Sequence, residues 1–191
     1  MNIDITKFSK DNVVDTCSIW NIISCVKFYT ITIDIVTQFA LTEYVVYEAL
    51  YKERKSENPL EEKLKIKLRK EIDLKNFKVY NISIADLQEV EILKNRKNLG
   101  MGEISSIAFA KKSKNLCFLT DDQNARKFSS DIVKVNTQTT SHLLGWLFYD
   151  GHLLDGDLQD IIDDHNSFNR PLEKYFKEVY EVALSFKLMK K

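Results

Sequence analysis

Acidic side chains stand at the edges of four apolar segments of this 191-residue chain. They are Asp15 after Val13-Val14, Glu48 in TEYVVYEAL, Glu103 in GEISSIAFA, and Asp121-Asp122 after LCFLT. In an α/β fold, strand ends and helix starts gather the reactive side chains. Carboxylates that meet without cations repel one another and are costly to desolvate. A shared divalent metal with hard oxygen ligands, Mg²⁺ or Mn²⁺, is the usual reason for such a cluster.

The elements that would position these side chains alternate between strands and helices. The expected strands cover 13–19, 30–36, 79–82, 116–120 and 132–135. The expected helices cover 20–26, 42–51, 60–72, 84–94, 103–112 and 122–128, with three more over 141–150, 157–166 and 172–188. The strand over 30–36 rests on the β-branched alternation TITIDIV. Strands that alternate with helices predict a parallel sheet covered on both faces.

The aspartates also have ordinary structural roles open to them. Asp15 and one of Asp121 and Asp122 could serve as helix N-caps, because Asp is among the preferred residues at that position. Thr16 could hold the site by hydrogen bonding or could be a local turn residue.

The glutamates leave two alternatives open as well. Glu43 and Glu48 are five residues apart, so on a helix they point about 140° away from each other, and periodicity does not choose between them. Glu103 shares a helix face with Ile107 and Ala110, so it would point inward and need a partner. It could also be a first-turn glutamate that the helix dipole stabilises.

The order and spacing of these segments resemble the PIN domain, a family of metal-dependent ribonucleases. The matching residues are Asp15 in VVDTCS, Glu48 in VVYEAL, Glu103 in LGMGEISSIAFA and Asp121-Asp122 in LTDDQNAR. The stretch LLGWLFYDGHLL over 143–154 looks like the continuation seen in one branch of the family. The resemblance implies a three-layer α/β/α fold with a short central parallel sheet and extra C-terminal helices. We expect a single domain over 1–191, with an α/β core over about 11–136 and a helical extension over about 140–191.

The same resemblance implies a metal-dependent ribonuclease that hydrolyses RNA phosphodiester bonds, an endoribonuclease with Mg²⁺ or Mn²⁺ as its cofactor. It implies that Asp15, Glu48, Glu103 and Asp121 hold the ion or ions and that Asp122 assists. It favours Glu48 over Glu43, because Glu48 follows the VVY run. Compact members of the family are often toxins of toxin–antitoxin pairs or act in defence, form homodimers and are held inactive by an inhibitory protein partner.

Two other classes of function stay open. One is a catalytically silent PIN-like module that binds RNA or protein. The other is a phosphohydrolase that uses Asp15 as its nucleophile, as haloacid-dehalogenase-like enzymes do. Those enzymes place a second Asp two residues after the first, where this chain has Cys17.

Basic side chains near the acidic segments are candidates for binding RNA. They are Lys94, Arg96 and Lys97 in KNRKNLGMGE, Arg126 after LTDDQNA, and Lys63, Lys67 and Lys70 on the expected helix 60–72. Exposed Lys and Arg are common on any surface, and Arg126 could hold Asp122 in an ion pair instead. The net charge is zero, which argues against a general nucleic-acid binder but permits a local basic face.

Composition sets the remaining limits. Hydrophobic residues are 44% and charged residues 29%, which is typical of a globular protein. No apolar run approaches the roughly 20 residues of a membrane span, and the start MNIDITKFSKD lacks the apolar core of a secretory signal. We therefore expect a cytoplasmic protein with no membrane partner. The three cysteines form no C-x-x-C pair, and the three histidines lack the spacing of zinc ligands.

Overall fold

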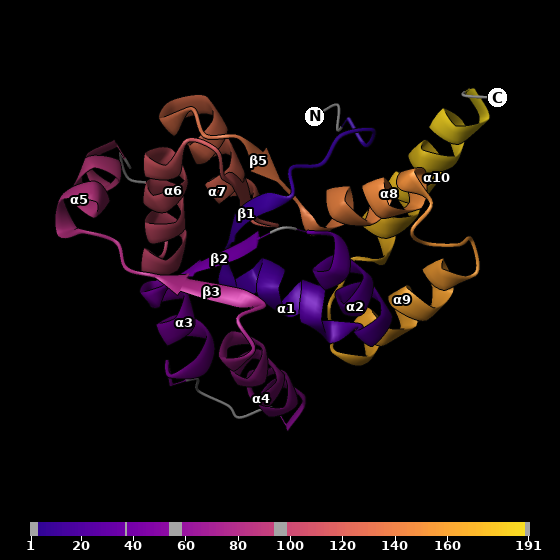
Figure 1. The fold of residues 1–191 in the computed structure, drawn as a ribbon, viewed down its shortest axis with the longest axis horizontal. Coiled ribbons are helices and arrows are strands. Elements are labelled where there is room, and N and C mark those ends of the chain that lie inside the picture. Colours follow the sequence, from indigo (N-terminus) through magenta and orange to yellow (C-terminus); the bar gives the residue numbers. More distant parts are fainter. Residues whose placement is uncertain (1–3, 37, 54–58, 94–98, 190–191) are drawn as a thin grey trace.

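The computed structural model of the protein describes residues 4–36, 38–53, 59–93 and 99–189. A five-stranded sheet with the strand order β3-β2-β1-β4-β5 forms its centre (Figure 1). The strands are β1 (Asp11–Val14), β2 (Gln38–Thr42), β3 (Phe77–Tyr80), β4 (Cys117–Leu119) and β5 (Thr137–Gln138). Neighbouring strands pair in parallel throughout, as the alternation of strands and helices predicted.

Helices surround this sheet and extend it at one end. They are α1 (Thr16–Ser24), α2 (Val26–Ile35), α3 (Glu43–Leu50), α4 (Pro59–Asp73), α5 (Ile84–Leu93), α6 (Met101–Ser113), α7 (Gln123–Phe128), α8 (Thr140–Asp150), α9 (Asp157–Ser167) and α10 (Glu173–Met189). The helix α10 packs on α8 and α9, and these three helices form the orange and yellow end of the molecule in Figure 1.

The sheet separates two hydrophobic cores, because successive strand residues point to opposite faces. Val13 and Phe118 join the core that α5, α6 and α7 cover, whereas Val14 and Leu119 join the core beneath α1, α2 and α8. The helices α3, α4, α9 and α10 also contribute to the latter core. This arrangement is the three-layer α/β/α fold with extra C-terminal helices that the sequence predicted.

The segment 30–36 is helical, so the strand expected there is wrong. Its helix α2 begins after Cys25, whose sulfur accepts a hydrogen bond from the Phe28 backbone N–H at 3.4 Å. The helix buries Phe28, Tyr29 and Thr32, a spacing that matches one helix face. Burial in the core beneath α1, α2 and α8 thus outweighs the strand propensity of TITIDIV, because β propensity depends strongly on tertiary context.

The strand β2 was not predicted from the sequence. Its residues Phe39, Ala40 and Leu41 are all buried, so the segment lacks the alternation of polar and apolar residues that marks a half-exposed strand. A continuous buried run is typical of a central parallel strand, which is covered on both faces. It is also hard to distinguish from a buried helix segment of the same length.

Two other segments differ from expectation, one in its boundary and one in its type. The strand expected over 13–19 ends at Val14, because Asp15 caps α1, which starts at Thr16 and not near residue 20. The strand expected over 132–135 is wrong, since α7 continues into a π-helical turn over Ser129–Val133. Val133 and Val135 are buried in the core that α5, α6 and α7 cover, and they do not pair in the sheet. The last strand is β5, four residues further along the chain than that turn.

The other expected helices and strands agree with the structure to within a few residues. Within the described ranges, no helix is both long and apolar enough to cross a membrane.

Candidate active site

The centre of the sheet contains a topological switch point. The strands β1 and β4 lie side by side, and the chain continues from β1 toward β2 but from β4 toward β5, on opposite sides. Asp15 directly follows β1, and Asp121 follows β4 by two residues. Ligands of open α/β sheets bind at the carboxyl ends of the strands where the order reverses. Asp15 and Asp121, which we call the Asp pair, therefore lie where the fold favours a site.

One serine links the two members of the Asp pair. The Ser18 backbone N–H donates to Oδ1 of Asp15 at 2.8 Å, and the Ser18 hydroxyl donates to Oδ2 of Asp121 at 3.2 Å. The Asp121 backbone N–H donates back to the Ser18 hydroxyl at 3.0 Å. The two carboxylates are thus adjacent, although they are more than a hundred residues apart in the sequence.

Asp15 is the more buried member, with 3% of its surface exposed. Loss of hydration raises its pKa to about 7, and the negative charge of Asp121 contributes in the same direction. Hydrogen bonds from the Thr120 hydroxyl and from Ser18 lower the pKa but do not offset burial. Without a cation, burial therefore favours the neutral form of Asp15 far more than in an exposed aspartate.

Asp121 is held from several sides. Its Oδ2 accepts from the Asn21 side-chain amide at 2.8 Å and from the Thr140 hydroxyl at 2.5 Å. Its Oδ1 accepts from the Thr140 backbone N–H at 2.9 Å. Thr140 is the first residue of α8, so the carboxylate lies at a helix N-terminus, which favours negative charge. Ser18, Asn21 and Thr140 were not among the residues predicted for the site.

Glu48 and Glu103, which we call the Glu pair, meet around Gly100. The Gly100 backbone N–H donates to Oε2 of Glu103 at 2.6 Å, so Glu103 forms part of a capping box at the start of α6. A Cβ atom added to Gly100 would lie 3.4 Å from Oε1 of Glu48 and 3.6 Å from Oε2 of Glu103. Both carboxylates therefore reach the same point of the backbone, from α3 and from α6.

Small residues and one hydroxyl position Glu48. The Thr16 hydroxyl donates to its Oε2 at 3.3 Å, so Thr16 contacts the site, one of the two roles open to it. The Lys52 ammonium lies 3.8 Å from Oε1. A Cβ atom on Gly102 would overlap the Glu48 carboxylate, so only glycine leaves room for it there. The sequence GMG before Glu103 therefore has a packing role that the sequence alone did not indicate.

The start of α1 connects the two pairs. Asp15 belongs to the Asp pair, and the hydroxyl of the next residue, Thr16, donates to Glu48 of the Glu pair. The pKa of the Cys17 thiol is raised to about 12, first by loss of hydration and then by the charge of Asp15, with smaller contributions from Asp121 and Glu103 in the same direction. We call the region around the two pairs the acidic site.

Two other candidates, Asp122 and Arg126, lie near Asp121. Asp122 is the N-cap of α7, with its Oδ1 accepting from the Ala125 backbone N–H at 2.6 Å, which is the structural role expected for one of the two aspartates. Arg126 donates to the Thr120 carbonyl oxygen at 3.1 Å. It also lines, together with Asp121, a cavity of about 340 Å³.

The position of Glu43 separates it from Glu48. The Asn81 amide nitrogen donates to the carboxylate oxygens of Glu43 when it faces them, at the end of β3. Glu48, on the same helix, instead lies beside Gly100, which the Glu103 carboxylate also approaches.

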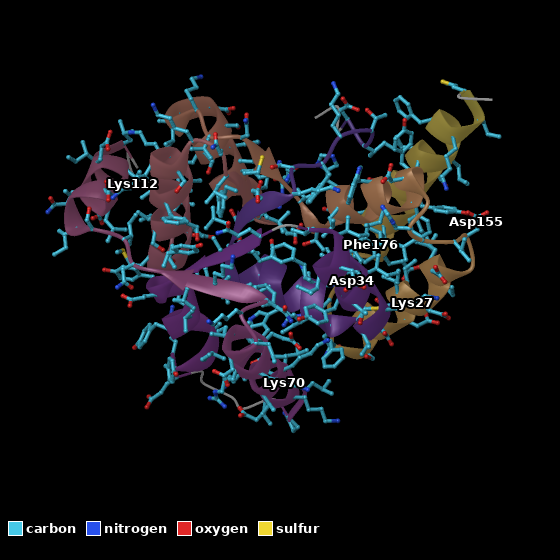
Figure 2. The ribbon with its side chains drawn as sticks, viewed as in Figure 1. Lys27, Asp34, Lys70, Lys112, Asp155 and Phe176 are labelled. Atoms are coloured by element: carbon cyan, nitrogen blue, oxygen red, sulfur yellow. The ribbon has the colours of Figure 1, made fainter. Side chains whose placement is uncertain are left out.

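The basic candidates differ in how exposed they are. Lys94, Arg96 and Lys97 lie outside the residues that the structure describes. Lys67 donates to the Ile23 carbonyl oxygen at 2.9 Å and lies 4.4 Å from the centre of the Tyr29 ring, and burial lowers its pKa. Lys63 and Lys70 are exposed, and Figure 2 shows Lys70 at the outer side of α4.

The side chains of the Asp pair and the Glu pair have the chemistry of ligands for a divalent cation. They are carboxylates, the ligands that Mg²⁺ and Mn²⁺ prefer. Burial raises the pKa of Asp15, and a bound cation would stabilise its negative charge. As they stand, no three Asp, Glu, His or Cys side chains in the described ranges are close enough to share one ion. The chemistry of the donors therefore fits a hard cation, and the four carboxylates are arranged as two pairs.

Comparison with known proteins identifies a family. A family model for the PIN domain matches residues 13–167 of the chain, from within β1 to the end of α9. No curated protein and no solved structure matches the chain significantly. The matched region contains both acidic pairs and all of the parallel sheet except the first two residues of β1. The chain belongs to the PIN-domain family and has a fold of the nuclease type.

Proposed function

We propose that the protein is a metal-dependent endoribonuclease that hydrolyses phosphodiester bonds in RNA. The observation that carries this proposal is the position of the Asp pair at the β1/β4 switch point, with Glu48 of the Glu pair held by Thr16, the residue next to Asp15. Carboxylates in this number bind a cation better than they bind an anionic substrate directly, because they repel phosphate. A bound metal ion would allow the carboxylates and the phosphate of the substrate to lie close together.

The ion would be Mg²⁺ or Mn²⁺, held by Asp15, Glu48, Glu103 and Asp121, with Asp122 assisting. When bound, it supplies Lewis acidity, which lowers the pKa of a water molecule and neutralises charge on the phosphate.

The protein's own groups would orient the reactants. Ser18 and Thr140 fix Asp121, so its oxygens keep one direction during turnover. Asp15 has a pKa of about 7 without a cation, so it can hold or release a proton near neutral pH. Arg126, anchored on the Thr120 carbonyl beside Asp121, is placed to contact an RNA phosphate.

The path of the RNA beyond the acidic site would follow basic side chains. Lys63 and Lys70 are exposed on α4, which packs on α1, the helix capped by Asp15, and on α3, the helix of Glu48. Lys94, Arg96 and Lys97 precede Gly100 in the sequence and would add to the same path. The Lys67 ammonium already contacts the Ile23 carbonyl oxygen and the Tyr29 ring, so we expect Lys67 to contribute least to RNA binding.

One observation favours a second function, a catalytically silent module that binds RNA or protein. It is the separation of the four carboxylates into two pairs, with no three acidic side chains gathered among the described residues. Such a module would keep the fold and the RNA path without cleaving the strand.

A cleavage assay separates the two functions. The purified protein is incubated with single-stranded RNA in the presence of Mn²⁺, Mg²⁺ or a chelator, and the products are analysed for 5′-phosphate ends. We expect cleavage that needs the metal and is lost in Asp121→Asn. Cleavage that persists in that variant would identify a contaminant, and an inactive wild-type protein that still binds RNA would establish the silent module.

A toxin or defence role, a homodimer and an inhibitory protein partner belong to the same proposal and rest on the family resemblance. The neighbouring open reading frame is the direct test. Growth arrest on expression of this chain, relieved by co-expression of the neighbour and absent in Asp121→Asn, is the expected result. Growth arrest that Asp121→Asn leaves unchanged would contradict a nuclease toxin.

A further inference from the structure

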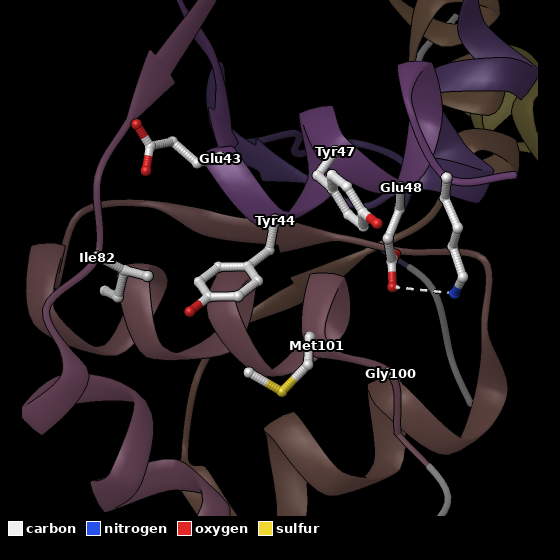
Figure 3. Close-up of a pocket in the computed structure, with 8 residues that line it drawn as sticks. Glu43, Tyr44, Tyr47, Glu48, Ile82, Gly100 and Met101 are labelled. Atoms are coloured by element: carbon white, nitrogen blue, oxygen red, sulfur yellow. Dashed lines mark ion pairs between the residues drawn. The ribbon is translucent and has the colours of Figure 1, made fainter.

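A cavity of about 550 Å³ opens directly beside the Glu pair (Figure 3). Its walls include Glu43, Tyr44, Tyr47, Glu48, Ile82 and Met101. A volume of this size is within the range of small-molecule sites. Glu48 and Gly100 line this cavity and also belong to the Glu pair's surroundings, so a strand bound at the acidic site would lie beside the cavity.

Aromatic side chains dominate one wall. Tyr44 and Tyr47 are three residues apart on α3, which places them on one face of the helix. Tyr47 keeps 57% of its surface exposed, although α3 buries Val45 and Ala49 on its other side. Figure 3 shows Tyr44 pointing from α3 toward Met101 of α6, with Tyr47 beside Glu48. Exposed flat rings of this kind stack on unpaired nucleobases.

The charge of the cavity selects against a phosphate. Glu43 and Glu48 both line it, and the ammonium of Lys52 is 3.8 Å from Glu48, where it offsets part of that charge. The other carboxylate of the cavity is Glu43, whose oxygens accept from the Asn81 amide at the end of β3 and keep further lone pairs for a ligand. A neutral, flat group with N–H donors on its edge is complementary to tyrosine faces and a carboxylate.

We propose that this cavity binds an unpaired nucleobase of the RNA, with guanine preferred, next to the phosphate that is cleaved. This inference rests on the proposed ribonuclease function and deepens it. Guanine carries two adjacent donors, N1–H and the N2 amine, which match the two oxygens of one carboxylate such as Glu43. Uracil carries one donor between two acceptors, and adenine and cytosine carry an acceptor beside their amine. The tyrosine rings stack on any base, and Glu43 selects among the bases.

Binding of free nucleosides tests the cavity apart from catalysis. Guanosine, inosine and uridine are titrated into the protein without metal, and chemical shifts of the tyrosine rings report binding. Inosine lacks the N2 amine, so we expect it to bind about tenfold more weakly than guanosine, and uridine more weakly still. In Glu43→Gln, the preference for guanosine over inosine should fall to within about twofold.

Substitutions of the tyrosines test the stacking. Tyr47→Ala should weaken guanosine binding and raise the KM for a guanine-containing oligoribonucleotide by about tenfold, while Tyr47→Phe keeps the ring and both values. Tyr51→Ala is the matched control. Tyr51 directly follows α3, four residues after Tyr47 and on the same side of the helix. It is 64% exposed and does not line the cavity.

The outcomes separate this inference from the proposed function. If the wild-type protein cleaves RNA but Tyr47→Ala behaves like Tyr51→Ala, the base site is overturned and a protein is the better occupant. Equal affinities for guanosine, inosine and uridine overturn the preference for guanine. If guanosine binds with the expected dependence on Tyr47 and Glu43 but no RNA is cleaved, the base site stands and the ribonuclease function fails.

Discussion

The Asp pair and the Glu pair carry the same chemical groups, but the fold holds them differently. Asp15 and Asp121 leave adjacent strands, and hydrogen bonds from Ser18 connect them. Asp121 also receives two hydrogen bonds from Thr140. Strand ends move little in a buried sheet, so the Asp pair has a defined geometry before any ligand binds.

The carboxylates of the Glu pair belong to longer side chains, which project from two helices. Oε2 of Glu48 accepts from Thr16 over 3.3 Å, a long hydrogen bond, and glycines leave the space around its carboxylate. Glu103 contacts the backbone of Gly100 at the start of α6. The Glu48 carboxylate can therefore shift toward a cation or substrate at small energetic expense. The difference predicts a division of labour, in which the Asp pair would fix the position of the ion and Glu48 would adapt.

Helix N-termini explain how so many carboxylates can remain together. Asp15 caps α1 and Asp122 caps α7, while Asp121 accepts from the first residue of α8 and Glu103 from the residue before α6. Each such position favours a negative charge by about 0.3–1 kcal/mol. The structural role as a cap and the proposed role at the site are therefore compatible in the same side chain.

Neutralising a member of the Asp pair should have the largest effect on activity. Asp121→Asn should lower kcat by about 1000-fold, because a positioned anionic ligand is lost with little change in volume. Glu48→Gln should lower kcat by about ten- to 100-fold, because a neighbouring carboxylate can adjust. Steady-state cleavage of a labelled RNA measures both.

Asp131→Asn is the matched control for that comparison, because Asp131 is exposed in the turn after α7, where it accepts a hydrogen bond from Ser130. It should retain wild-type cleavage. Equal losses in Asp121→Asn and Glu48→Gln would contradict the division of labour between the two pairs.

Asp15 should also affect how the free energy of unfolding depends on pH. Its folded pKa of about 7 is above the ordinary value of 3.8, so its contribution to stability is fully present below about pH 3.8 and is lost as the pH rises through 7. Asp15→Asn should therefore raise the free energy of unfolding at pH 8 by up to about 4 kcal/mol, with a smaller gain at pH 5. Thermal unfolding at the two pH values without metal measures this difference.

Metal provides the control for the same variant. Mn²⁺ should raise the melting temperature of the wild-type protein at pH 8, because a ligand that binds the folded state stabilises it. It should raise that of Asp15→Asn much less. A variant that is less stable than wild type at pH 8 would show that the hydrogen bonds of Asp15 outweigh its burial.

The adaptable pair should respond to Gly102. In Gly102→Ala the new methyl group overlaps the Glu48 carboxylate, which must shift from its present position. We expect kcat to fall by about tenfold or more. The free energy of unfolding should change by less than about 1 kcal/mol, because the displaced group is the end of a flexible side chain.

Gly156→Ala controls for the general effect of replacing glycine, since no atom lies within 4 Å of a Cβ atom added there. Its cleavage rate should match the wild type. Full activity in Gly102→Ala would mean that the position of Glu48 does not matter for cleavage.

The sequence predicted most of the fold because the helices have strong periodicity and the strands β1 and β4 are short apolar runs next to charged residues. It missed β2 because a strand buried on both faces has no alternation, as QFALT shows. It mistook α2 for a strand because β-branched residues favour strands locally, while burial of Phe28 and Thr32 decides the outcome.

For the site, the sequence indicated the carboxylates but not the groups that hold them. Ser18 and Asn21 are three residues apart on α1 and face Asp121, which is visible only once β1 and β4 are known to be neighbours. Thr140 reaches the same carboxylate from beyond β5. Contacts between segments more than a hundred residues apart depend on the strand order, which local patterns do not specify.

The smallest expected effect concerns the side from which RNA reaches the two pairs. The exposed lysines Lys63 and Lys70 lie on α4, which packs on α3, the helix of Glu48. In the double variant Lys63→Gln/Lys70→Gln, each lost phosphate contact should reduce the slope of log affinity against log salt by about 0.7. Filter binding of single-stranded RNA to the metal-free protein at several salt concentrations measures this slope.

Two comparisons locate that path. Lys67→Gln should change stability by about 1 kcal/mol rather than the salt slope, because Lys67 is engaged with Ile23 and Tyr29. Arg126→Gln removes a cation beside the Asp pair instead. If Arg126→Gln lowers the slope and the α4 double variant does not, RNA approaches past the Asp pair. The opposite result places the strand along α4 and past the Glu pair, where an adaptable carboxylate would meet the incoming phosphate first.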